Sequence, residues 1–314
     1  MDKFNDLFSY PNVVLVGRGH KIVKGTDTKR EAIVVGVTQK IPIVRLKVGQ
    51  VIPSMFDGKV TDVIEVGEIK ALRTGKYRPC PGGVSIGHYL VTAGTFGATV
   101  KKQGKRVILS NAHVLNNVNS GQVGDPVYQP GVYDGGTPMD RIGSVLMSVP
   151  VRFSGESTCP FAGLIASILN GLAKLFHRKT RMIPWVSEEN KVDCAIALPD
   201  SDGIILDEIL EIGKPTGYDI VDIGDGVKKS GRTTGLTYGT VLVMDARVTV
   251  DYGSDGKAIF VDQIITDMKS AGGDSGSAVL DDEDSIIGLL FAGSDTVTIV
   301  NKIDNVIEAL ELDV

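Results

Sequence analysis

The sequence predicts a mainly β protein: a small α/β or α+β domain over residues 1–80, then a β-rich domain over residues 81–314 that ends in a helix. A length of 314 residues allows two domains. Glycine accounts for 38 of these residues, about 12% against about 7% in average proteins, which indicates many tight turns. From residue 82 onward, short apolar runs recur about every 8–12 residues between turn signals, a pattern typical of a sandwich or barrel.

The first 80 residues alternate between apolar and polar segments. Short β-branched runs at 13–16, 32–38 and 63–66 are separated by charged and proline-containing stretches, which favours a small domain with its own sheet. Residues 77–83, YRPCPGG, are dense in turn-forming residues. We predict that this segment links the two domains.

Two helices are predicted within the β-rich domain. One spans residues 161–177 and interrupts the run of strands. The other closes the domain at 303–312, where Ile303, Val306, Ile307 and Leu310 follow the i, i+3, i+4, i+7 spacing of a helix with one buried face.

Charge and cysteine content exclude several classes of protein. There are 33 basic and 38 acidic residues, a net charge of −5, so the chain lacks the basic surface of a nucleic-acid-binding protein. Cys80, Cys159 and Cys194 cannot all pair within one chain, which favours reduced thiols and a cytoplasmic location. From the first residues and the longest apolar runs we expect no cleaved secretory signal and no membrane crossing. It also has no pattern suited to a metal or cofactor.

The sharpest local motif is GGDSGS at residues 272–277. Glycines around a serine allow a tight turn that exposes the hydroxyl of Ser275. The same turn can aim the backbone amides of Gly273 and Ser275 at one point, where they can hold a developing oxyanion. A plain glycine-rich turn is the alternative.

A serine nucleophile needs a base, and histidine suits that task at neutral pH. Of the four histidines, His113 stands out because RVILSNAHVL carries an apolar strand directly into it. His88 and His177 are interpreted as exposed residues, and His20 has no evident acidic partner.

The imidazole in turn needs a carboxylate that fixes its tautomer. Asp193 opens the apolar run of KVDCAIAL, where an unpaired acid would be costly. An aspartate facing solvent at a strand start is the alternative.

Taken together, these motifs resemble those of a known protein family. SNAHVL, VDCAIAL and GGDSGS, in the order His, Asp, Ser, resemble the catalytic motifs of trypsin-like and chymotrypsin-like serine peptidases. Longer segments, among them VSIGHYLVTAGTFGATV, VKKSGRTTGLTYG and GLLFAGS, resemble bacterial trypsin-like proteins related to the plant Narrow Leaf protein. The likeness covers most of residues 82–312, and HKIVKG and DGKVTDVIEVG resemble that group's leader region.

The resemblance implies two six-stranded antiparallel β-barrels, at about 82–205 and 206–300, with the active site between them. It implies that His113 is the general base, Asp193 its orienting acid and Ser275 the nucleophile. The amides of Gly273 and Ser275 would form the oxyanion hole.

The resemblance also implies a substrate pocket. Counting back six residues from Ser275 places Lys269 at its floor, where a lysine would disfavour basic substrates and admit acidic ones. A lysine turned outward to solvent is the favoured alternative. Pocket walls would come from Ser270 and from residues 290–294, including Ala292, Gly293 and Ser294.

One feature of the family does not transfer. Trypsin-like zymogens mature when a new apolar N-terminus pairs with the acidic residue before the serine, here Asp274. The candidate terminus IVKG at 22–25 lies 91 residues before His113. This long separation favours the interpretation that its likeness to such a terminus is a coincidence.

Two further segments invite more than one interpretation. Residues 161–177 would form an amphipathic helix with Lys174, Arg178, Lys179 and Arg181 at its end. It could contact a membrane surface or a partner, cover the cleft as a lid, or pack on a barrel, and packing is favoured. The acidic run 281–284 is interpreted as a solvated hairpin rather than a calcium loop.

The predicted function is a serine endopeptidase that hydrolyses a protein or peptide substrate through an acyl-enzyme, with no cofactor. A rival hypothesis is a binding or assembly protein on the same scaffold, compatible with a homo-oligomer. A third is a latent peptidase held closed by its first 80 residues.

Overall fold

The computed structural model describes residues 4–47, 49–67, 73–90, 93–156, 160–176, 178, 181–183, 185–186 and 188–314. Cys159 and His177 therefore lie outside the described residues, whereas Cys80 and Cys194 are buried free thiols. The chain forms two compact units, Met1–Ala71 and Leu72–Val314.

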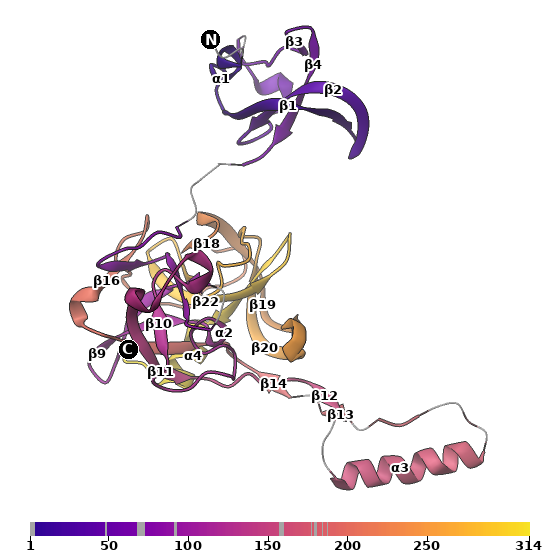
Figure 1. The fold of residues 1–314 in the computed structure, drawn as a ribbon, viewed down its shortest axis with the longest axis vertical. Helices are drawn as coiled ribbons and strands as arrows, with labels where there is room; N and C mark the ends of the chain where they lie inside the picture. Colours follow the sequence, from indigo (N-terminus) through magenta and orange to yellow (C-terminus); the bar gives the residue numbers. More distant parts are fainter. Residues whose placement is uncertain are drawn as a thin grey trace. The chain divides into compact units, whose positions relative to one another are not determined.

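The first unit is a four-stranded sheet with one helical turn (Figure 1). Its elements are α1 (Asn5–Phe8), β1 (Val13–Val23), β2 (Thr26–Val37), the 3₁₀ turn η1 (Ile43–Arg45), β3 (Met55–Phe56) and β4 (Lys59–Glu65). The order is β1-β2-β4-β3, with β2 and β4 parallel. Lys24 and Gly25 both have positive φ and form the two-residue turn of the β1–β2 hairpin.

The first barrel of the second unit contains six antiparallel strands. In spatial order they are β6 (Ser85–His88), β10 (Pro126–Tyr128), β11 (Arg141–Ser148), β15 (Ala195–Pro199), β9 (Lys105–Ser110) and β8 (Ala98–Lys102). The short strand β7 (Gly94–Thr95) extends the sheet beside β6. A backbone bond from Phe96 N to Val84 O, 2.9 Å long, joins the segments that enter β8 and β6.

The second barrel is a closed ring of six antiparallel strands. They are β18 (Gly226–Gly231), β19 (Gly235–Asp251), β20 (Lys257–Thr266), β23 (Thr298–Lys302), β22 (Ser285–Gly293) and β21 (Ala278–Leu280). The ring closes because β23 pairs with both β20 and β22, and β21 pairs with both β22 and β18.

The closing helix α4 (Ile303–Leu310) confirms the predicted helical spacing. Its buried Ile303, Val306 and Leu310 share one core with Leu109 of the first barrel and Leu280 of the second. The fold is therefore a trypsin-like double β-barrel with a C-terminal helix, as the sequence predicts.

Short elements complete the second unit. They are β5 (Cys80–Gly82), α2 (Ala112–Leu115), η2 (Val132–Asp134), η3 (Pro138–Asp140), η4 (Asp202–Ile204), β16 (Ile205–Ile209), β17 (Gly217–Tyr218) and η5 (Gly253–Asp255). Strand β5 pairs in parallel with β16. The turn-rich residues 77–83 are thus part of the second unit, and the division between the units falls between Ala71 and Leu72.

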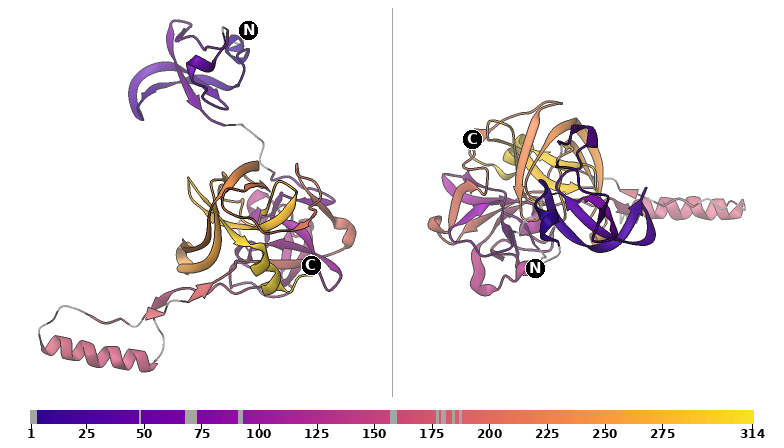
Figure 2. Two further views of the ribbon diagram at one scale, coloured as in Figure 1. Left: turned by 180° about the vertical axis from the view of Figure 1, so that it is seen from behind. Right: turned by 90° about the horizontal axis from the view of Figure 1, so that it is seen from above.

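An arm-like insertion lies between β11 and β15. It contains β12 (Gly155–Glu156), the helix α3 (Pro160–Leu175), β13 (Trp185–Val186), which pairs with β12, and β14 (Glu189–Asn190), which pairs in parallel with β20 (Figures 1 and 2). The helix predicted at 161–177 is confirmed. The favoured expectation that its apolar face packs on a barrel is wrong, because six large apolar side chains of α3, and Phe176 just after the helix, remain 37–71% exposed. No helix among the described residues has the length and apolarity that a membrane span requires.

Candidate active site

The carboxylate of Asp193 is held by hydrogen bonds from several parts of the chain. Asp193 lies just before β15 and is completely buried. Its Oδ1 accepts the backbone amides of Ala112 at 2.8 Å and His113 at 3.2 Å. Its Oδ2 accepts His113 Nδ1 and the hydroxyl of Tyr252, each at 2.7 Å. Four donors therefore compensate a charge that burial alone would make costly.

The imidazole of His113 is positioned by a single helical turn. Strand β9 ends at Ser110, Asn111 stays extended, and α2 begins at Ala112. The first amides of any helix lack an internal acceptor, and here two of them bond to Asp193. With Nδ1 donating to Asp193, the other ring nitrogen, Nε2, has no hydrogen-bond partner among the described residues and is able to accept a proton.

The electrostatics of the pair favour an ionised aspartate. Burial raises the pKa of Asp193, but the charge of His113 and the hydrogen bonds from His113 and Tyr252 outweigh it and hold that pKa below its ordinary value. Burial, together with the Asp193 charge, raises the pKa of Tyr252, so its hydroxyl remains a donor.

Sequence reasoning missed Tyr252, which sits at the turn of the long β19–β20 hairpin. Its ring lies edge-on to His113 with centroids 6.1 Å apart, edge-on to Phe153 at 5.6 Å, and stacked on Phe260 at 6.3 Å. The segment DYGSDG shows a hairpin turn but gives no sign that its tyrosine reaches a strand 59 residues away.

The loop that carries Ser275 has the tight turn that its glycines predict. Asp274 N bonds to Ala271 O and Ser277 N to Asp274 O, each at 3.0 Å. Gly273 has a φ of 97°, and a Cβ there would lie 2.5 Å from Thr233 Oγ1, so only glycine fits. Within the described part of the chain, the amides of Gly273 and Ser275 donate to no acceptor.

Thr95 of β7 ties this loop to the first barrel. Its amide bonds to Ser275 O at 2.8 Å, and its hydroxyl bonds to Gly273 O at 2.8 Å. Both carbonyls of the two candidate oxyanion-hole residues are thereby fixed, which orients the neighbouring peptide planes. Threonine in the sequence TAGTFG carries no motif that signals this role.

Asp274, the residue before the serine, is paired internally. Its carboxylate lies 3.4 Å from Lys229 Nζ, and both side chains are fully buried. Asp274 also accepts the amides of Thr233, Thr234 and Ala271. Burial lowers the pKa of Lys229 to about 8, against the opposing effect of Asp274. The buried carboxylate of Asp274 is thus paired with a cation from strand β18.

Ser275 bonds to Phe291, a residue that also lines a cavity beside His113. The Ser275 hydroxyl is partly exposed, and its one recorded partner among the described residues is Phe291 O at 3.4 Å. A cavity of about 440 Å³ adjoins His113 and is bounded by Tyr252 and by Phe291, Ala292 and Gly293 of β22. The strand predicted as a pocket wall therefore lies beside the imidazole.

The other residues predicted for the pocket occupy different settings. Lys269 is exposed, and its carbonyl accepts the hydroxyl of Thr237. Ser270 bonds to Thr298 Oγ1 at 2.6 Å and lies against Gly293. Ser294 turns the chain after β22, with its amide bonded to Val297 O.

Two other histidines are paired with acids. His88, interpreted from the sequence as exposed, is fully buried and its Nε2 lies 3.0 Å from Asp125 Oδ2. His20, for which no acidic partner was evident, lies 3.1 Å from Asp27 Oδ2 across the β1–β2 hairpin. Neither lines the cavity beside His113.

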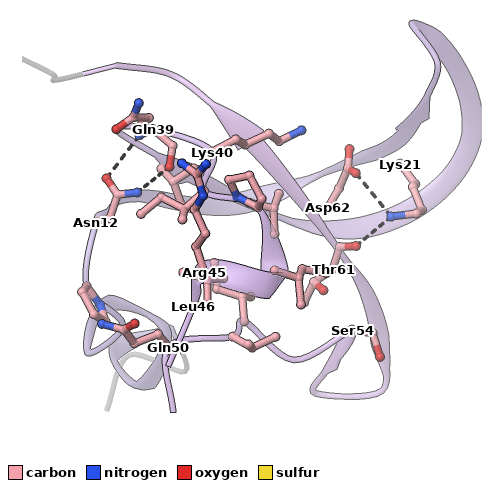
Figure 3. A pocket seen from close by; sticks show the side chains of 18 residues that line it. Asn12, Lys21, Gln39, Lys40, Arg45, Leu46, Gln50, Ser54, Thr61 and Asp62 are labelled. Atoms are coloured by element: carbon pink, nitrogen blue, oxygen red, sulfur yellow. Dashed lines mark hydrogen bonds and ion pairs between the residues drawn. The ribbon is translucent and has the colours of Figure 1, made fainter. Parts of the chain in front are cut away.

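The first unit contains a cavity of its own, of about 710 Å³ (Figure 3). Lys21, Lys40 and Arg45 lie at its edge, and Lys21 bonds to Thr61 O at 2.9 Å and Asp62 Oδ1 at 3.3 Å. The cavity is larger than the one at His113, yet it lacks a nucleophile paired with a base.

The second unit thus combines a trypsin-like double barrel with a buried His113–Asp193 pair and a glycine-rich loop that carries Ser275. No protein-family model and no curated protein sequence matches the chain. Solved structures similar to it are serine proteases. Nocardiopsis protease is 17% identical over 74% of this chain and 96% of its own, with a TM-score of 0.48. Thermobifida fusca protease A is 16% identical over 74% and 96%, with a TM-score of 0.47. A glutamic acid specific serine protease is 20% identical over 74% and 98%, with a TM-score of 0.47.

Proposed function

We propose that the protein is a serine endopeptidase that uses Ser275, His113 and Asp193 as its catalytic triad. The observation that carries the proposal is the bond between His113 Nδ1 and the buried Asp193, which leaves Nε2 free to accept a proton. A carboxylate that fixes the imidazole tautomer and leaves the second ring nitrogen free is the arrangement that a serine nucleophile requires of its base.

The reaction begins with a peptide carbonyl bound against the serine loop. As Ser275 Oγ attacks the carbonyl carbon, Nε2 of His113 takes the hydroxyl proton. The negative oxygen of the tetrahedral intermediate is held by the amides of Gly273 and Ser275, which have no other described acceptor. His113 then returns the proton to the leaving amine, and water later releases the acyl group by the reverse sequence.

Asp193 and its donors support this cycle through His113. The carboxylate fixes the tautomer with the proton on Nδ1 and stabilises the imidazolium that forms. The hydroxyl of Tyr252 helps to hold Asp193 as the anion. We further propose, from the motif resemblance, a relationship to the bacterial proteins related to the plant Narrow Leaf protein.

The experiment is labelling of the full chain by a fluorophosphonate, combined with cleavage of a mixed peptide library. We expect stoichiometric labelling that Ser275→Ala abolishes. Ser120→Ala, at an exposed serine, is the matched control and should label as the unmodified chain does. Labelling that survives in Ser275→Ala would refute the assignment.

A second candidate function is a non-catalytic scaffold. It is favoured by the hydroxyl of Ser275, whose one recorded partner is Phe291 O rather than His113. Absence of both labelling and cleavage in a folded sample, verified by a cooperative thermal transition, would support this candidate.

A further inference from the structure

Helix α3 carries a continuous apolar face that the described part of the chain leaves uncovered. Its large side chains recur at helical spacing within less than half of the helix circumference. They are Phe161, Leu164, Ile165, Ile168, Leu169, Leu172 and, just after the helix, Phe176, and the end residues are 70% and 71% exposed. Single exposed apolar residues are ordinary, whereas a contiguous patch marks a site of interaction.

The opposite side of α3 makes the contact with the returning chain. It holds small and polar residues, of which Ala166 is only 8% exposed. Asn170 bonds to the backbone of Met182 in both directions, donating to its carbonyl at 2.9 Å and accepting its amide at 2.7 Å. The returning chain therefore contacts the helix on its small-residue side. The large residues are left outward because the helix has its intramolecular contact elsewhere.

The charge of this segment differs from that of the whole protein. Residues 157–187 contain four basic residues, Lys174, Arg178, Lys179 and Arg181, and no Asp or Glu, whereas the chain as a whole carries −5. The side chains of Lys174, Arg178 and Arg181 are exposed, and none has an ion-pair partner among the described residues. The segment thus combines an open apolar face with unneutralised cations at one end.

We propose that α3 is a docking element for an anionic lipid surface. Its apolar side chains would enter the boundary between headgroups and acyl chains while the cations contact lipid phosphates. The side that carries Asn170 would face away from the lipid. The 16 residues of α3 extend about 24 Å, shorter than a membrane span of about 20 residues, so the helix lies in the surface plane. The proposal does not depend on peptidase activity.

The primary test is co-sedimentation of the full chain with vesicles. Vesicles of phosphatidylcholine alone are compared with vesicles that contain phosphatidylglycerol. We expect about tenfold or stronger binding to the anionic vesicles, since each cation near the surface adds attraction, and we expect added salt to weaken it. The chain's single tryptophan, Trp185, follows Arg181 by four residues and provides a fluorescence signal for the same titration.

Matched variants separate the apolar face from the charge. The double variant Ile168→Glu/Leu172→Glu places charge at the centre of the face and should abolish binding to both vesicle types. Ser167→Gln, on the opposite side, is the control and should bind as the unmodified chain. Replacing Lys174, Arg178 and Arg181 by glutamine should remove the preference for anionic vesicles. Unchanged thermal melting would show that each variant is folded.

Two outcomes would overturn the proposal. One is equal vesicle binding by the unmodified chain and the Ile168→Glu/Leu172→Glu variant, or no binding to either vesicle by a folded chain. The other is a dimer in solution that dissociates in this variant while the unmodified chain ignores vesicles, which would assign the face to a second copy of the chain.

Discussion

Tyr252 illustrates how the environment of one carboxylate is assembled from distant parts of the chain. Its hydroxyl is one of four donors to Asp193, and its ring is held by Phe153 and Phe260. The bond favours the ionised carboxylate, because a donor to the charged form lowers its pKa. Tyr252 is therefore a positioning residue that acts through Asp193.

The variant Tyr252→Phe tests this role. Loss of a hydrogen bond to a charged group costs about 1.5–3 kcal/mol, so we expect kcat/KM to fall about tenfold or more. The pKa of Asp193 should also rise towards its ordinary value, which an NMR titration of the carboxyl group would measure. Tyr238→Phe, at an exposed tyrosine, is the control. A lower rate with an unchanged pKa of Asp193 would indicate a packing effect only.

Lys229 provides a pH dependence whose sign can be derived. Its pKa is lowered from 10.5 to about 8 by burial, so the folded protein loses this proton before the unfolded chain does. Between these values the unfolded state binds more protons, and this group makes the free energy of unfolding rise with pH. The same deprotonation leaves Asp274 without its cation.

We therefore expect Ser275 labelling to decline above pH 8 while the protein remains folded. Labelling rates and thermal melting measured from pH 6 to 10 would separate the two effects. Lys229→Met should lose labelling and about 3–5 kcal/mol of stability, because it leaves Asp274 buried and unpaired. A labelling rate that stays constant to pH 10 would argue against the role of this pair.

At the scale of elements, the β19–β20 hairpin connects the arm to the carboxylate of Asp193. Asn190 of β14 donates to Ile259 O of β20 at 3.1 Å, and it exchanges two hydrogen bonds with the backbone of Arg152. Ser154 forms a β-bridge with Lys257. Both ends of the arm are thus anchored on the hairpin that carries Tyr252.

The helices show what sequence periodicity can and cannot predict. The apolar stripe of α4 packs in a core built from both barrels. The similar stripe of α3 is exposed. Periodicity identifies the element and the face, because both are local properties. It does not identify the neighbour, because that depends on contacts between distant residues such as Asn170 and Met182.

The motifs of the site follow the same rule. His113, Asp193 and Ser275 stand in local patterns that signal their chemistry. Tyr252, Thr95 and Lys229 are ordinary residues of strands and turns, and only the folded chain brings them to the site. The proposed reacting groups can therefore be identified from sequence motifs. The residues that hold those groups in position are harder to identify in this way.

Replacing α3 should leave the barrels intact. We expect a chain in which a short Gly-Ser linker substitutes for residues 157–184 to melt within about 2 °C of the full chain, because the exposed face contributes little buried area. Ser275 should label at an unchanged rate. A large loss of stability would mean that the helix does pack on the second unit.

At the scale of the whole molecule, the boundary between the two units has a consequence for truncation. Arg73, only 8% exposed, belongs to the second unit. Its guanidinium bonds to Ser230 and pairs with Glu211, and its amide bonds to Arg232 O at 3.1 Å. Tyr77 N bonds to Gln129 at 2.9 Å. Residues 73–80 therefore help to stabilise the second unit.

Two truncations distinguish these roles and also test latency. A chain beginning at Leu72 should keep the melting temperature of the second unit and the labelling rate of Ser275, because it retains every contact of Arg73 and Tyr77 within that unit. A chain beginning at Pro81 should melt about 5–10 °C lower, since it loses several hydrogen bonds, one of them from a buried guanidinium. Differential scanning calorimetry and fluorophosphonate labelling would measure both. A marked gain in labelling rate in the chain from Leu72 would instead mean that the first 71 residues inhibit the site.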